Sequence, residues 1–217
     1  MTTITPSGQA GHLYLLLRAL GLAAQLVTLD KAWTNAAQLF ASDAPETTDS
    51  KPVAPPTKEE QLRAINIVRE AYEQTWLDFA EVAEQLEPLF VENADAIRRG
   101  QPALMEQLSE VGKAKFQNVL NSNSDLAAAA QAAAAHMRTS ANSEIALVRG
   151  EVDKMAKGGT SDGDMSQEEE LAVGAVAGAA GSLLGPEATV IIEILAHTSV
   201  GESIVHGIGS FFHSIFG

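Results

Sequence analysis

The chain has 217 residues and a net charge of −14, a size that suits one domain and a charge that disfavours nucleic acid binding. It contains no cysteine, which excludes disulfides and thiolate metal sites. Residues 158–217 carry no Lys or Arg but eight acidic side chains, so the acidic excess is concentrated towards the C-terminus.

The first predicted helix starts near Ser7 and runs to about Phe40. Its apolar run, Leu13–Leu29, is about one membrane span long, but Arg18 interrupts it and no basic segment precedes it as in a secretory signal. We therefore expect segment 1–41 to form a buried amphipathic helix rather than a membrane element. Residues 42–58 are rich in proline and lack apolar periodicity, which predicts a linker.

A capping box, in which Thr57 is followed three residues later by Glu60, predicts the start of a long helix. Apolar residues then recur at alternating spacings of three and four, which is typical of a helix that packs along one stripe. We expect Pro88 to kink this helix and Gly100-Gln-Pro102 to end it. The stripe comprises Leu62, Ile65, Tyr72, Trp76, Phe79, Ala83, Leu86 and Phe90, with Arg69 as its polar interruption.

Two further helices are predicted before residue 158. The first starts at Pro102, and Ser124 or Asp125 caps the second, which runs from Leu126 to about Lys157. The alanine-rich first half of the second helix allows a neighbouring helix to approach closely. The first helix should turn Leu104, Leu108, Val111, Val119 and Leu120 inward.

These patterns predict an all-α protein, an elongated bundle of four or five helices in which residues 59–157 supply the long ones. Residues 158–165 are rich in Gly and Asp and read as a second linker. Ser166 with Glu169 forms another capping-box pattern, which predicts that helix resumes there.

The C-terminal segment, residues 166–217, is the most apolar part of the chain and is predicted to form a hairpin followed by a tail. The run Leu171–Pro186 has no ionisable side chain and a turn is expected at Gly185-Pro186-Glu187. A soluble chain must bury such a run as a central helix or deliver it to a membrane or a partner. Gly174, Gly178 and Gly181 are small enough to let two helices approach closely. The second arm of the hairpin carries Ile191, Ile192 and Glu193.

The tail has a wide apolar face at helical spacing. In composition it resembles the histidine- and phenylalanine-rich membrane-active peptides of fish mast cells, although it lacks Lys and Arg. Acid would charge His206 and His213 and neutralise Glu193, so these three residues are expected to sense pH. A C-terminal helix that docks on the chain's own helices is the alternative. The apolar face comprises Ile204, Ile208, Phe211, Phe212, Ile215 and Phe216.

The leading hypothesis is a membrane-active protein that inserts or forms pores, with acid as the expected trigger. Its layout resembles that of α-helical pore-forming toxins, in which long amphipathic helices shelter a hydrophobic hairpin. The alternative is a structural or interaction protein whose apolar C-terminus packs in a homo- or hetero-oligomeric assembly.

Both hypotheses place contact with a lipid membrane or another protein chain in residues 171–217, and we expect a homo-oligomer. No arrangement of nucleophile, base and orienting group is visible, so we expect no enzyme activity, no cofactor and no metal. The sequence does not decide where the protein is located. Secretion without a Sec signal and association with a membrane are the two alternatives.

Overall fold

The computed structural model describes residues 8–41, 57–106, 110–159 and 165–196, the stretch 185–196 by its backbone alone. Every regular element in these ranges is a helix, which confirms the all-α fold class. The helices number six in the described part, more than the four or five expected. They are α1 (Gln9–Ala41), α2 (Lys58–Glu92), α3 (Ala94–Glu106), α4 (Glu110–Ser122), α5 (Leu126–Ala156) and α6 (Gln167–Ala196).

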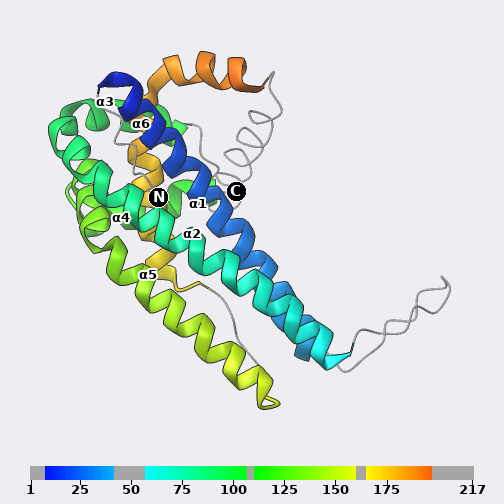
Figure 1. Cartoon of the computed structure of the whole chain (residues 1–217). Coiled ribbons are helices and arrows are strands. Elements are labelled where there is room, and N and C mark those ends of the chain that lie inside the picture. The colour runs from blue at the N-terminus through cyan, green and yellow to red at the C-terminus, as the bar shows by residue number, and fades with distance from the viewer. Residues whose placement is uncertain (1–7, 42–56, 107–109, 160–164, 197–217) are drawn as a thin grey trace.

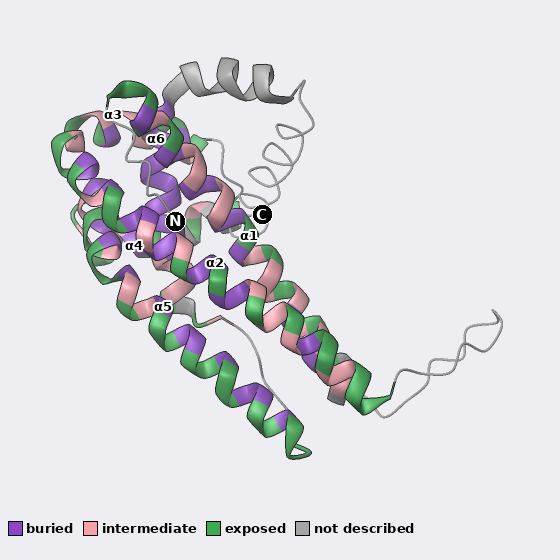
Figure 2. Ribbon diagram, viewed as in Figure 1, coloured by how far each residue is buried: buried purple, intermediate pink, exposed green. Residues whose placement is uncertain are grey.

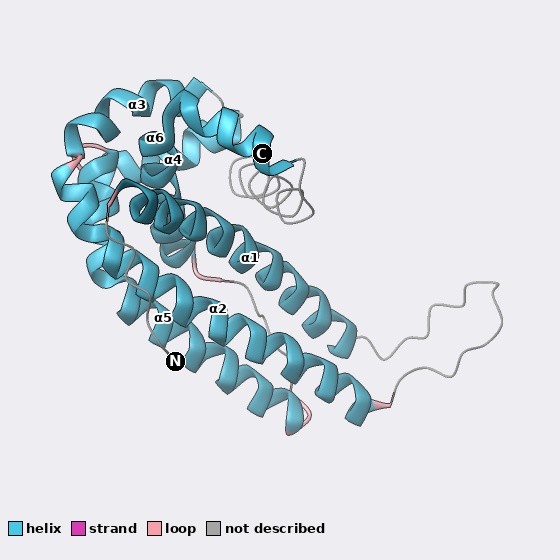
Figure 3. Cartoon of the chain, turned by 45° about the horizontal axis from the view of Figure 1, so that its top comes forward, coloured by secondary structure: helices cyan, strands magenta, loops and turns pink. Residues whose placement is uncertain are grey.

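Three long helices, α1, α2 and α5, lie side by side, with α2 packed against both of the others (Figure 1, Figure 3). The α2–α5 contact is the most extensive in the described part. Helix α6 packs on α5, α3 and α1, and α4 touches α5 and α6. One hydrophobic core therefore draws on α1, α2, α3, α5 and α6, while α4 contributes at its edge.

The apolar stripe of α2 faces the core, as the sequence predicted. Trp76, Phe79 and Leu86 are fully buried, and the outer face of the same helix is exposed (Figure 2). The ring of Trp76 meets its neighbours edge to face, with centroids 6.2 Å from Tyr72 and 6.5 Å from Phe79. Of the predicted stripe, only Leu62 is half-buried rather than buried.

The predicted caps of α2 and α5 are present. The Thr57 side chain accepts from the Glu60 backbone N–H, and the Glu60 side chain accepts from Thr57 N, which completes the capping box. Asp125 caps α5 by accepting from the Ala128 backbone N–H at 2.9 Å. The alanine face of α5, with Ala130, Ala134 and Ala141 fully buried, lets α2 approach closely.

The break after the α2 stripe was predicted at the wrong place. Helix α2 runs through Pro88 and ends at Glu92, and its C-cap residue Asn93 donates to the Leu89 carbonyl from both its backbone N–H and its side-chain amide. Helix α3 then continues through Gly100 and Pro102, where an end was expected. Gly100 packs directly against α6, and packing of this kind can outweigh the low helix propensity of glycine.

The predicted C-terminal hairpin is replaced over residues 167–196 by one helix, α6, which is continuous across the expected turn at Gly185-Pro186-Glu187. Figure 1 shows α6 changing direction between its gold and orange parts. Pro186 has no N–H to donate, and its ring crowds the carbonyl four residues earlier, so a proline here bends a helix without ending it. The amphipathic tail lies outside the described residues.

Candidate functional site

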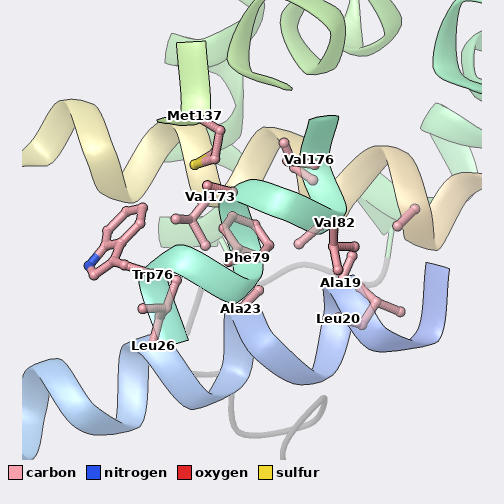
Figure 4. Packing of buried hydrophobic residues seen from close by; sticks show 14 of the residues in the cluster. Ala19, Leu20, Ala23, Leu26, Trp76, Phe79, Val82, Met137, Val173 and Val176 are labelled. Atoms are coloured by element: carbon pink, nitrogen blue, oxygen red, sulfur yellow. The ribbon is translucent and has the colours of Figure 1, made fainter. Parts of the chain in front are cut away.

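The body of α6 is enclosed by the other helices. All eight residues from Val173 to Ala180 are buried, and no ionisable side chain occurs between Leu171 and Leu184. Figure 4 shows Val173 and Val176 on the side of α6 that faces Phe79 of α2. A helix that is apolar all round is stable in water only when covered, and here the rest of the chain provides the cover.

Different elements cover different sides of α6. Towards α3 the two backbones nearly touch, because a Cβ added at Gly100 would lie 2.7 Å from the Ser182 carbonyl oxygen. Towards α4 and α5, a small cluster of Val119, Ala129 and Ala175 closes the other flank. The residues at these two contacts are small, which lets α6 lie close to the helices that cover it.

The structure places only some of the predicted contact residues. Gly174 and Gly178 of α6 lie inside the fold, and Gly181 is half-buried. Ile191, Ile192 and Glu193 belong to the part of α6 described by its backbone alone. The remaining predicted residues, Ile204, His206, Ile208, Phe211, Phe212, His213, Ile215 and Phe216, lie outside the described residues. Their membrane, partner and pH-sensing roles stay predictions.

A buried carboxyl group lies where α6 begins. The Glu144 side chain of α5 is 2% exposed and accepts a hydrogen bond from the Tyr72 hydroxyl of α2 at 3.2 Å. The Glu169 carboxyl, in the first turn of α6, lies beside it. Three helices therefore meet at this point through polar side chains (α2, α5 and α6).

The surroundings of Glu144 favour its neutral form. Burial, then the negative charge of Glu169 and a hydrogen bond with that carboxyl, raise the pKa of Glu144 to about 7. Hydrogen bonds from the Tyr72 hydroxyl and the Ser166 backbone N–H lower the pKa of Glu144, but burial and Glu169 raise it by more. Burial raises the pKa of Tyr72 well above its ordinary value, so Tyr72 stays protonated and serves as a donor.

Two further polar contacts fix helices near the start of α6. The Met165 backbone N–H donates to Asp30 of α1 at 2.9 Å, which ties the residue before α6 to the first helix. The Trp33 indole N–H of α1 donates to Glu151 of α5 at 3.3 Å. Both acceptors come from helices that precede α6 in the chain.

Sequence reasoning missed these carboxylates, although a signal was present. Along α5, the buried residues recur at alternating spacings of three and four, and two glutamates fall within that inward stripe. A Glu on an otherwise apolar stripe indicates a buried acid that needs a partner. The stripe comprises Ala134, Met137, Ala141, Glu144, Val148, Glu151 and Met155.

The described part is thus an all-helical protein with an apolar helix at its centre. Within its four ranges, no group of three His, Asp or Glu side chains could hold a metal ion. One described helix, α1 over Gln9–Gln38, is long and apolar enough to cross a membrane, a property that core helices of soluble proteins share. Comparisons with family models, with curated proteins and with solved structures return no match for this chain.

Proposed function

We propose that the protein is membrane-active and non-enzymatic, and that α6 with the residues after it enters a lipid bilayer. The observation that supports this is the enclosed α6, which is free of ionisable groups over Leu171–Leu184 and is covered by the other helices. Lipid chains can replace the apolar cover that α1, α3 and α5 give it.

The length of α6 suits a single membrane span. If the bend at Pro186 straightens on insertion, a helix from Leu171 to Ala196 extends about 39 Å, more than the ~30 Å hydrocarbon core of a bilayer. The predicted hairpin would have divided this length between two short arms. Glu187 and Glu193 lie within the span and would be neutral or paired once inserted, which favours entry at acid pH.

We further propose that inserted chains associate as homo-oligomers. Gly174, Gly178 and Gly181 would lie on α6 at spacings that allow close contact between helices in lipid. The amphipathic tail, with His206 and His213, would add binding at the membrane surface as these groups gain charge.

The deciding experiment combines dye release from liposomes with a reporter of which helix moves. Because the chain has no cysteine, single cysteines can be labelled cleanly with an environment-sensitive dye. We would place the dye at Leu183 of α6, at Leu22 of α1 and at Leu147 of α5. The first two side chains are half-buried, and the third is 42% exposed and serves as control.

The proposal expects leakage between pH 5 and 7, with a lipid-type emission shift at position 183 and none at 147. An emission shift at position 22 without one at position 183 would indicate that α1, and not α6, enters the bilayer. Liposomes of several compositions that stay sealed over this range, together with a defined oligomer in sedimentation, would favour the alternative of an assembly protein.

A further inference from the structure

We propose that Glu144 and Glu169 form a proton-dependent latch that holds the first turn of α6 against α5. The latch is closed when one proton is shared between the two carboxyl groups and opens when both are ionised. This inference goes beyond membrane activity and does not depend on it.

The geometry calls for a proton at this position. One oxygen of Glu169, Oε2, is buried and has no hydrogen-bond partner among the described residues. Glu144 accepts hydrogen bonds from the Tyr72 hydroxyl and the Ser166 backbone N–H, but neither donor comes from Glu169. A proton on either carboxyl would turn two facing acceptors into a donor and an acceptor, and would satisfy the unpaired oxygen.

No cation in the described part takes the place of that proton. On α2, Tyr72 faces Glu144 and is neutral, while the next residue, Glu73, binds both Arg69 and Arg149. The other acids near the site have their own interactions. On α1, Asp30 accepts from Met165, and on α5, Glu151 accepts from Trp33. In the first turn of α6, Glu168 and Glu170 flank Glu169 and add negative charge.

The direction of the pH effect follows from linkage. The pKa of Glu144 is raised in the closed state, so the latch is strongest below the ordinary value of about 4.5 and weakens as pH rises towards 7. Above about 7 the carboxyl is ionised in both states and the effect levels off. This direction is opposite to the acid trigger expected for Glu193, His206 and His213, so acid would strengthen the hold on the start of α6.

The latch can be measured in the full chain without lipid. Hydrogen–deuterium exchange of peptides covering residues 169–184, corrected for the intrinsic pH dependence of exchange, reports how often the start of α6 opens. We expect opening to rise by up to tenfold per pH unit between pH 5 and 7 and to level off above 7. Exchange in α2 should lack this pH profile.

Three variants separate the latch from a general loss of structure. Glu144→Gln and Glu169→Gln each keep the shape of the side chain and remove one carboxyl, so exchange in α6 should lose its pH dependence. Glu151→Gln removes another buried glutamate from the same face of α5 and should keep the profile of the parent protein. A profile that is unchanged in both latch variants overturns the proposal.

A second measurement covers the case in which these variants fail to fold. Carbon-13 labelling of glutamate carboxyls allows Glu144 to be titrated by NMR in the parent protein. A carboxyl that titrates near 7 supports the latch, and one that titrates near 4.5 overturns it. Since neither measurement involves a membrane, failure of the latch and failure of the proposed function are distinguishable.

Discussion

Arg149 of α5 donates two parallel hydrogen bonds to the Glu73 carboxylate of α2, from Nε to Oε1 at 3.0 Å and from Nη2 to Oε2 at 2.6 Å. Arg69 adds a third at 2.5 Å. The Glu73 side chain is only 10% exposed. Burial raises its pKa, but the hydrogen bonds from Arg149 and Arg69 outweigh this, so the pKa of Glu73 lies below its usual value.

This contact predicts a clear loss of stability in Glu73→Gln, of about 1–3 kcal/mol, because two arginines lose a buried charged acceptor. The chain offers a matched control. Arg138 of α5 binds Glu84 of α2 through the same pair of atoms, but that carboxylate is 45% exposed. Glu84→Gln should cost about 0.5 kcal/mol or less. Urea unfolding of both variants measures the difference, and equal losses would contradict the role of burial.

The same carboxylate predicts an acid-dependent loss of stability. Since the pKa of Glu73 is lowered in the folded state, its contribution is present above the unfolded value of about 4.5 and is lost as pH falls through the folded pKa. The gap in unfolding free energy between the parent protein and Glu73→Gln should therefore shrink between pH 6 and pH 3. A gap that stays constant across this range would show that the charge is not responsible.

The core stripe predicts a large effect at Trp76 and a small one at its neighbour. Trp76 is fully buried, and Trp76→Ala should lower the free energy of unfolding by about 3–5 kcal/mol. Leu77, the next residue, is 36% exposed on the other side of α2, and Leu77→Ala should cost less than about 1 kcal/mol. If the two variants have similar denaturation midpoints, Trp76 is not buried in the core and the apolar stripe of α2 lies at a surface.

Glycine substitutions in two helices should act in opposite directions. A Cβ at Gly100 would lie 2.7 Å from a backbone oxygen of α6, so Gly100→Ala should destabilise by about 1 kcal/mol or more, despite the better helix propensity of alanine. At Gly150 of α5 nothing lies within 4 Å of the added atom. Gly150→Ala should therefore stabilise by about 0.5–1 kcal/mol. Thermal or urea unfolding gives both signs, and a stabilised Gly100→Ala would mean that α3 and α6 are further apart.

The proposed membrane activity predicts an effect of charge in the tail. Phe211→Asp combined with Phe212→Asp adds two carboxylates to the predicted apolar face, each costing about 2.5–3.5 kcal/mol at the centre of a bilayer. Dye release should be lost while circular dichroism in solution stays close to that of the parent protein. His213→Ala, on the predicted polar face, should retain release at neutral pH. Release that survives the double change would remove the tail from the mechanism.

Local sequence patterns predicted much of the fold. The α2 stripe, the Thr57 capping box and the Asp125 cap each depend on residues within a few positions of one another, and all three are present. The all-helical class follows from the same short-range periodicity. These features could be predicted because a helix satisfies its backbone hydrogen bonds locally.

The errors concern long-range packing. One helix was expected to end at Gly100 and the next to start at Pro102, but α3 continues through both residues and the helix boundary fell at Asn93. Where an end was expected, Gly100 of α3 lies against Ser182, more than eighty positions away in the chain. The carboxyl pair of Glu144 and Glu169 arises in the same way, because only the packing of α5 against α6 brings the two side chains together.

The position of α6 in the chain has a consequence for the order of folding. Asp30 and Met165, whose hydrogen bond joins α1 to the start of α6, are 135 positions apart. Helices α1, α2 and α5 all emerge from the ribosome before α6 and can pair with one another, but the side of Phe79 that faces α6 stays uncovered until α6 is made (Figure 4). The nascent chain thus exposes this apolar surface until α6 is made, and during that time aggregation competes with folding. Closure of the core therefore waits for α6, which packs on helices that are made before it.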